Sequence, residues 1–304
     1  MAAQLRAVRA RIRAVKSIAK ITRAQELIAS SRIVRAQQRT RSAEPYAREL
    51  TTAVEAVVSR STTISHPMIN EPESIKRSAA LIITSDGGFA GAYNANVLRE
   101  ASRLRQRNTD EGVETLNYVA GRKGIGWHRF RDLPIEAEWS GFSAQPTYAK
   151  AEEVATALLD AFEKDPADGG VDEIYLVSTE FVSMLTQRPV VRRLLPMEIE
   201  EREGERPGGA LPSYEFEPST DVVLDALLPQ YVASRIYYAM LEAAASELAA
   251  RRRAMKAATD NAHDLIDRLT REANNARQAE ITQEISEIVG GSNALAEANA
   301  GSEN

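Results

Sequence analysis

The sequence predicts an α/β domain combined with a long antiparallel coiled coil made from the two ends of the chain. Three observations carry this prediction. Neither glycine nor proline occurs at residues 2–44, and neither occurs at 230–289, although the whole chain has 16 glycines and 12 prolines. Between these stretches, residues 75–215 alternate β-branched and helical segments, which is typical of a Rossmann-like domain with a mainly parallel sheet.

The amino-terminal stretch, residues 1–61, predicts one long coiled-coil helix whose pattern continues past Pro45. The part before the proline would be about 65 Å long at 1.5 Å per residue, whereas ordinary globular helices average about 11 or 12 residues. Its apolar residues step by three and four, as in a seam between two wound helices. We expect two such runs, separated by a break in phase: Leu5, Val8, Ile12 and Val15, then Ile18, Ile21, Gln25 and Ile28.

The middle of the chain predicts the α/β domain. Four segments are rich in β-branched or aromatic residues and predict strands at 79–86, 113–121, 171–181 and 189–195. Helical segments at 93–108 and 148–164 separate the first three strands. The stretch 163–170 is predicted to be an acidic loop, and 200–218 a polar linker.

The carboxyl-terminal stretch, residues 220–289, predicts the second coiled-coil helix, and 290–304 a small polar tail. The breaker-free part, 230–289, would be on the order of 90 Å long. It is crowded with strong helix formers. Its predicted seam steps by three and four through Ala262, Ile266, Leu269, Ala273 and Ala276, and then through Ile281, Ile285 and Ile288.

Composition excludes several kinds of chemistry. The chain has no cysteine, so disulfides, thiolate catalysis and cysteine-bound metals are excluded, as suits a reducing compartment. No apolar run reaches the roughly 20 residues that a membrane-spanning helix needs. The net charge of −5 hides an asymmetry. Residues 1–41 carry eleven Lys or Arg and one acid, so a basic arm precedes an acidic body and calls for an acidic partner.

The glycine-rich turn at SDGGFAG (85–91) has the outline of a nucleotide site, because it follows an apolar strand and opens a helix. Its spacing does not fit the G-x-G-x-x-G fingerprint, and no Lys-Ser or Lys-Thr follows as in a P-loop. Asp86 would oppose the charge of a phosphate. We therefore expect these glycines to turn the chain without a cofactor.

No active site or metal site is predicted elsewhere. His66, His128 and His263 are scattered and lack the spacing of metal ligands. For the basic arm three interpretations compete: a partner protein, nucleic acid phosphates, and a solvated helix face. A transit peptide is disfavoured because the pattern runs past forty residues without a cleavage zone.

Three segments together resemble the gamma subunit of F-type ATP synthases, from residue 1 to about 295. They are SIAKITRAQELIASSRIVRAQ (17–37), ITSDGGFAGAYN (83–94) and, most specifically, SELAARRRAMKAATDNAHDLIDRLTREANNARQAEITQEISEIVGGSNAL (246–295). The resemblance implies a non-catalytic rotor subunit. Its terminal helices form a shaft inside a ring of three alpha and three beta subunits, and its α/β domain joins the epsilon subunit and the c-ring.

The resemblance also implies where this rotor works and which residues contact its partners. Turning with the proton-driven c-ring, it would couple rotation to ATP synthesis at the beta subunits. It would lie at the cytoplasmic face of the cell membrane as a peripheral subunit, with no transmembrane segment and no nucleic acid partner. Beta-subunit contacts are implied for Arg277, Gln278, Thr282 and Glu284, and on the opposing helix for Lys16, Lys20 and Arg23.

The sequence departs from the family pattern at a few positions. Gln25 stands where relatives usually have Met, and Asn274 where they usually have an aromatic residue. Gly87 and Ala90 replace Arg and Cys, and the loop 163–170 is long. Two alternatives to the rotor stay open on the residues alone: a nucleic-acid-binding coiled coil and a nucleotide-dependent enzyme.

Overall fold

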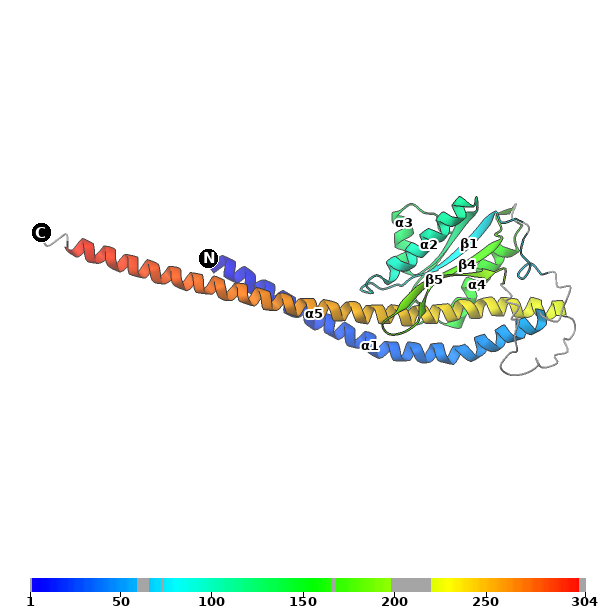
Figure 1. The fold of residues 1–304 in the computed structure, drawn as a ribbon, viewed down its shortest axis with the longest axis horizontal. Coiled ribbons are helices and arrows are strands. Elements are labelled where there is room, and N and C mark those ends of the chain that lie inside the picture. The colour runs from blue at the N-terminus through cyan, green and yellow to red at the C-terminus, as the bar shows by residue number, and fades with distance from the viewer. Residues whose placement is uncertain (1, 59–65, 73, 166–167, 198–219, 301–304) are drawn as a thin grey trace. The chain divides into compact units, whose positions relative to one another are not determined.

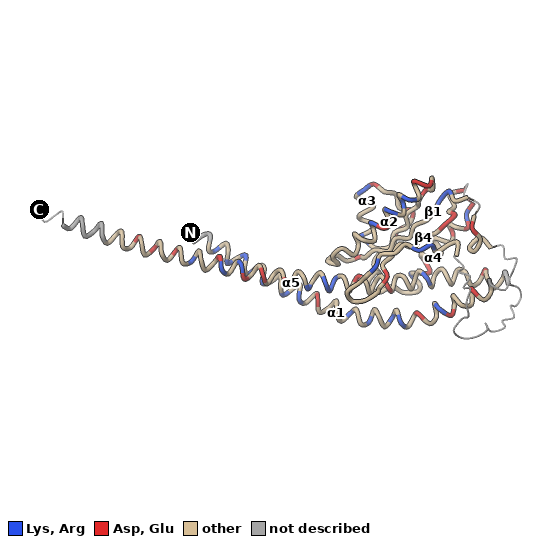
Figure 2. The backbone as a smooth tube through the Cα atoms, in the orientation of Figure 1, with Lys and Arg blue, Asp and Glu red and all other residues tan. Residues whose placement is uncertain are grey.

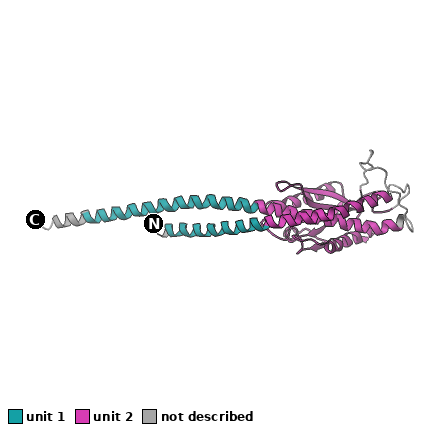
Figure 3. Cartoon of the chain, turned by 90° about the horizontal axis from the view of Figure 1, so that it is seen from below, with its two compact units in different colours: residues 1–28, 254–304 teal, residues 29–253 magenta. Residues whose placement is uncertain are grey.

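The computed structural model describes residues 2–58, 66–72, 74–165, 168–197 and 220–300. Two helices dominate the chain: α1 spans Ala2–Val58 and α5 spans Thr220–Ala300. The chain divides into two compact units, one made of residues 1–28 and 254–304 and one of residues 29–253 (Figure 3). Both α1 and α5 therefore contribute to each unit.

The larger unit contains a five-stranded sheet. Its strands are β1 (Arg77–Ile83), β2 (Glu114–Ala120), β3 (Ala137–Trp139), β4 (Glu173–Phe181) and β5 (Gln187–Leu195). They lie in the order β3-β2-β1-β4-β5, and only β5 runs antiparallel to its neighbour. The mainly parallel sheet is confirmed, and β1, β2, β4 and β5 occupy the four predicted strand segments.

Helices cover both faces of this sheet (Figure 1). On one face lie α2 (Tyr93–Asp110) and α3 (Arg122–Phe130), and on the other lie α4 (Tyr148–Glu163) and the terminal helices. The alternation of strand side chains explains the two layers. In β1, Leu81 and Ile83 pack toward α4, whereas Ala80 and Ile82 pack toward α2 and α3.

Two elements, α3 and β3, were not predicted from the sequence. The glycines of α3 lower its helix propensity, but Gly124 is needed for packing. A β-carbon there would come within 2.7 Å of Thr84 Oγ1, so only glycine allows the helix to approach β1 this closely. The strand β3 has only three residues, too few for a periodic signal.

The terminal helices run further than composition indicates. Pro45 lies inside α1 and Pro229 inside α5. The helix α5 also continues through Gly290 and Gly291 to Ala300, whereas the sequence predicts its end at residue 289. Two glycines cost a helix about 1 kcal/mol each, and the Ala- and Leu-containing segment that follows favours helix strongly. The polar linker 200–218 and residues 301–304 lie outside the described residues.

In both units the two terminal helices pair in antiparallel fashion. In the larger unit, Ile33 packs with Ala245 and Leu248, while Val54 shares a core with Leu228. In the smaller unit, Leu5 and Val8 pack with Leu269 and Ala273, as predicted for the first seam. A hydrogen bond of 2.7 Å between the hydroxyl oxygens of Thr22 and Thr259 extends this contact.

The second predicted seam of α1 is wrong by one residue. Ile18, Ile21 and Ile28 are 52%, 61% and 44% exposed, and Gln25 is also exposed. The buried positions that continue the first seam are Ala19, Thr22 and Glu26. The prediction rested on the largest apolar side chains, but small side chains let two helix backbones approach closely, so the spacing of three and four continues without a break.

Candidate functional site: a helix pair and a glycine turn

The outer face of α1 in the smaller unit carries a line of positive charge. Six exposed basic residues recur at steps of three and four, so they share one face of the helix. Figure 2 marks Lys and Arg in blue along this part of α1. The line is about 26 Å long at 1.5 Å per residue. We call it the basic stripe: Arg6, Arg9, Arg13, Lys16, Lys20 and Arg23.

Three residues implied as beta contacts, Lys16, Lys20 and Arg23, belong to the basic stripe. Arg23 also forms an ion pair of 2.8 Å with Glu26, whose side chain is buried in the seam. The exposed isoleucines Ile18, Ile21 and Ile28 lie on the other side of the seam, at about 100° per residue. The surface of α1 thus has three parts: the buried seam, the basic stripe on one side of it, and the exposed isoleucines on the other side.

The far end of α5 presents a second exposed surface. Ile281, Ile285 and Ile288 are 44%, 56% and 71% exposed, because α5 extends past the start of α1 in this unit (Figure 3). At about 100° per residue, they share one face of the helix, on the side away from the seam residue Ala276. We call this face the apolar stripe. It corrects the prediction that these isoleucines continue the seam.

The four carboxyl-terminal site residues border the apolar stripe. Arg277 and Glu284 lie along one margin and Gln278 and Thr282 along the other, at about 100° per residue. All four are exposed. The Thr282 hydroxyl donates to the Gln278 carbonyl at 2.9 Å, so it makes a bond within the helix.

The structure separates the seven predicted site residues into two surfaces. Thr22 contacts Thr259, which places the basic residues beside this part of α5. Arg277 lies eighteen residues further along, or about 27 Å at 1.5 Å per residue. The regular spacing of the basic stripe was not among the predictions, although the steps of three and four from Arg6 to Arg23 are readable in the sequence.

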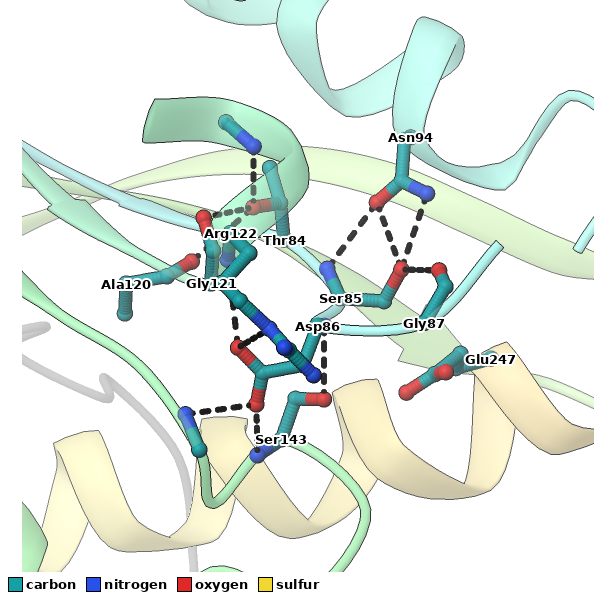
Figure 4. A network of polar contacts seen from close by, with 12 residues as sticks. Thr84, Ser85, Asp86, Gly87, Asn94, Ala120, Gly121, Arg122, Ser143 and Glu247 are labelled. Atoms are coloured by element: carbon teal, nitrogen blue, oxygen red, sulfur yellow. Dashed lines mark hydrogen bonds and ion pairs between the residues drawn. The ribbon is translucent and has the colours of Figure 1, made fainter. Parts of the chain in front are cut away.

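The glycine turn after β1 is organised by the carboxylate of Asp86 (Figure 4). Its oxygens accept hydrogen bonds from the backbone N–H groups of Arg122, Gly141 and Ser143 at 3.1, 2.9 and 3.0 Å. The Ser143 hydroxyl in turn accepts the backbone N–H of Asp86 at 2.8 Å. One side chain therefore joins the turn, the start of α3 and the loop 140–146.

Asp86 occupies the place where a Rossmann-like domain binds phosphate. Such domains use free N–H groups at the carboxyl edge of the parallel strands and at a helix amino end. Here Arg122, the first residue of α3, gives its N–H to the Asp86 carboxylate. The sequence predicted Asp86 to be an obstacle to phosphate, whereas in the structure its carboxylate takes the place of a phosphate. An acid directly before Gly-Gly was the available signal.

Little space is left at this edge of the sheet. The cavity lined by Asp86, Gly121, Ser143 and Glu247 has a volume of about 10 Å³. That is the room of about one water molecule, whereas ligand pockets measure about 300–1,000 Å³. This cavity is therefore far too small for a nucleotide.

The electrostatics of the turn agree with this arrangement. Burial acts to raise the pKa of Asp86, but the hydrogen bonds from Ser143, Gly141 and Arg122 outweigh it and hold the pKa below its ordinary value. The carboxylate is thus stabilised in its charged form. Burial raises the pKa of nearby Glu247 above its usual range, although attraction to Arg251 opposes the shift.

Among the described residues, His, Asp and Glu side chains form no group of three that could hold a metal ion. Within the same residues, no helix is both long and apolar enough to cross a membrane. Asn274 is exposed on α5, and residues 166–167 of the acidic loop lie outside the described residues.

Comparisons with known proteins give one result. The model of the ATP synthase family matches residues 4–295. Among curated relatives, the chain is 56% identical to the ATP synthase gamma chain of Thermobifida fusca over 306 residues, covering 100% of both chains. It is 59% identical to the ATP synthase gamma chain of Nocardioides sp. over 305 residues, again covering 100% of both.

Solved structures support the fold. The chain is similar to a chain from the Euglena gracilis mitochondrial ATP synthase, described as OSCP/F1/c-ring, with a TM-score of 0.68 at 16% identity, covering 97% of this chain and 95% of that one. It is also similar to a chain from the central stalk and c-ring of the Tetrahymena thermophila enzyme. There the TM-score is 0.56 at 20% identity, covering 78% of this chain and 99% of that one.

Proposed function

The chain belongs to the ATP synthase family, and from this premise we propose that it is the gamma subunit of a bacterial F-type ATP synthase. In this role it is the rotor of the central stalk. Rotation of the proton-driven c-ring turns the chain, and the turning helix pair changes the conformation of the beta subunits, which make ATP. The reverse direction couples ATP hydrolysis to proton transport.

The observation that carries the proposal is the antiparallel helix pair with its basic stripe. A rotor must contact each surrounding subunit in turn and release it again. Exposed charges interact over only about 8–10 Å at physiological ionic strength, and exposed ion pairs contribute about 0–1 kcal/mol each. The basic stripe from Arg6 to Arg23 therefore suits weak, repeated contacts with acidic segments of successive beta subunits.

The apolar stripe supports a second contact with the surrounding ring of three alpha and three beta subunits. Three isoleucines that are 44–71% exposed need cover, and polar groups on both margins can fix how a partner approaches. We assign Arg277, Gln278, Thr282 and Glu284 to beta-subunit contacts at these margins. Lys16, Lys20 and Arg23 make the corresponding contacts from the basic stripe.

The chain carries out no bond chemistry of its own in this proposal. The edge of the sheet that would hold a nucleotide is filled by the Asp86 carboxylate, which supports a mechanical rather than a catalytic role. The α/β domain then serves as the attachment for the epsilon subunit and the c-ring. This attachment places the chain at the cytoplasmic face of the cell membrane as a peripheral subunit.

Reconstitution tests the rotor function directly. The chain is mixed with alpha and beta subunits, and ATP hydrolysis and rotation of a probe on the α/β domain are measured. We expect rotation-coupled hydrolysis. A complex that hydrolyses ATP without rotating the chain would contradict the proposal, and so would steeply salt-dependent binding of duplex DNA with a log–log slope near −5.

Variants at the apolar stripe test the contact residues. Arg277→Ala and Gln278→Ala should each lower the rate of ATP hydrolysis by the reconstituted complex, because each removes a polar group at a beta contact. The matched controls are Arg268→Ala and Gln283→Ala, which remove the same groups from other faces of α5. Equal rates for all four variants and the wild type would remove the contact assignment and leave the rotor function standing.

A further inference from the structure

Helix α5 is tied to the α/β domain by two arginines that lie two positions apart. The guanidinium of Arg251 donates two hydrogen bonds to the carbonyl oxygen of Gly88, at 3.2 and 3.1 Å. The guanidinium of Arg253 donates to the carbonyl oxygen of Leu185 and to the side-chain oxygen of Gln187. Each arginine therefore binds a different loop of the domain.

The two anchors reach in opposite directions around the helix. Residues two apart in an α-helix are separated by about 200°. Arg251 reaches the glycine turn after β1, while Arg253 reaches the hairpin between β4 and β5. If α5 rolls about its own axis in either direction, one of the two contacts is stretched. A single anchor, or two on the same side, would not resist both directions.

The position of the Arg251 guanidinium is restricted by a buried neighbour. Its guanidinium forms a 2.5 Å ion pair with Glu247, whose side chain is only 2% exposed. A buried charged pair contributes little net stability, but it tolerates few alternative arrangements. A β-carbon at Gly87 would lie 2.7 Å from the Arg251 guanidinium, so the glycine found here leaves room for it.

Apolar contacts support both anchors. Ala250 packs with Ala90 and Tyr93 beside the glycine turn. On the hairpin side, Phe181 and Met184 pack against a cluster that includes Leu248 and Ala249 of α5. These apolar contacts hold the helix against the domain, but apolar packing is not directional. The directional restraint comes from the arginines.

The position of the anchors along the chain is also informative. Arg253 is the last residue of the larger unit, and residue 254 begins the carboxyl-terminal part of the smaller one. The anchors therefore lie in the last turn of α5 that belongs to the larger unit.

We propose that Arg251 and Arg253 form a rotational clamp that fixes helix α5 to the α/β domain against rolling in either direction. Both act as positioning residues, because they contact no nucleotide and hold the helix that does the mechanical work. The clamp rests on the proposed rotor function. In that function, torque from the c-ring enters through the α/β domain and leaves through the helix pair.

The test measures the torsional stiffness of the rotor in the reconstituted complex. Since the chain has no cysteine, a single Glu111→Cys change at the exposed position directly after α2 provides a specific attachment for a rotation probe. With rotation stalled, the width of the angular distribution of the probe reports stiffness. Arg253→Ala should widen this distribution. Removing both anchors should widen it further, whereas Arg252→Ala, with the same loss of charge between them, should not.

The direction of the effect follows because each anchor resists rolling in one direction. Loss of one anchor should therefore widen the angular distribution mainly on one side, with an angular variance at this turn at least about twice that of the wild type. Removal of Arg251 is combined with Glu247→Gln, so that no unpaired buried charge is left. Arg251→Lys keeps the charge and loses the forked geometry, and it should recover only part of the stiffness.

Each outcome decides between explanations. A wild-type complex that does not rotate contradicts the rotor function itself. A wild-type complex that rotates, with clamp variants whose angular distributions equal those of Arg252→Ala, overturns the clamp alone. If the variant lacking both anchors does not assemble, Arg253→Ala still tests the proposal, because that exposed side chain leaves no buried charge behind.

Discussion

Replacing Asp86 by alanine should destabilise the α/β domain strongly. The carboxylate accepts three backbone N–H groups, from Arg122, Gly141 and Ser143, at 2.9–3.1 Å. Its side chain is 10% exposed, so water cannot fully replace these bonds. Alanine leaves all three donors without their acceptor.

The magnitude follows from the number and type of bonds. Hydrogen bonds to a charged group contribute about 1.5–3 kcal/mol each, and bonds to one acceptor are not additive. We expect Asp86→Ala to lower the free energy of unfolding by about 3–5 kcal/mol, a large part of the 5–15 kcal/mol typical of a domain. Asp86→Asn keeps one oxygen acceptor and should cost about half as much.

The effect should depend on pH in a defined direction. The pKa of Asp86 is held below its ordinary value of 3.8 by the three N–H groups, against the effect of burial. A depressed pKa in the folded state gives stability that is present above the unfolded-state value and is lost as the pH falls through the folded value. The difference between wild type and Asp86→Ala should therefore be constant above about pH 5 and shrink below pH 4.

Urea unfolding followed by tryptophan fluorescence measures this difference. The chain has two tryptophans, Trp127 and Trp139, and both lie in the α/β domain, so the signal reports that domain alone. Asp160→Ala, at an exposed position of α4, is the matched control. Added phosphate should stabilise Asp86→Ala more than wild type, because an anion can take the place of the lost carboxylate. If Asp86→Ala unfolds at the same urea concentration as the control, the central role of this side chain is refuted.

Two further predictions concern a half-buried carboxyl group, Glu242, and a buried hydroxyl group, Thr22. Burial, opposed by Arg192, raises the pKa of Glu242 to about 7, so the wild-type domain loses stability as the pH rises from 4.5 to 7. Glu242→Gln should therefore gain about 2 kcal/mol relative to wild type between pH 5 and pH 8, and urea curves at the two pH values will show it. Thr22→Leu should destabilise the helix pair by about 1–3 kcal/mol, because the seam at Thr259 has no room for a larger side chain. Thermal melting followed by circular dichroism checks this, with the exposed Arg13→Leu as control.

Long periodic segments made most of the fold predictable. The breaker-free ends show the helix period over many turns, and the strand segments carry β-branched residues between helical ones. Both signals are local and repeat along the chain. The predictions failed where packing between segments distant in the sequence determines the structure. Gly124 lowers the helix propensity of α3, yet it allows α3 to approach Thr84, the residue directly after β1. No local sequence pattern reveals this contact.

The residues of the candidate site could be predicted from the sequence, but their division between two separate surfaces could not. Resemblance supplied Arg277 and Lys16, but it did not separate the two surfaces on which they lie. The predicted seam of α1 was wrong by one residue because Ile18 has a larger apolar side chain than Ala19, and the prediction considered size alone. Sequence spacing allowed both phases, and only the pairing with α5 distinguishes them.

The choice of small seam residues follows from what the outside of the helix pair must do. If Ile18, Ile21 and Ile28 filled the seam, the helices would stand further apart and the outer surface would lose its exposed isoleucines. With Ala19 and Thr22 in the seam, the two helix axes stay close together. The exposed isoleucines and the basic stripe then both remain available to partners. The same choice buries little apolar area, so the paired helices gain little stability from each other. A helix pair of this kind needs its partners for stability as well as for function, since each partner that binds the folded form alone shifts the folding equilibrium toward it.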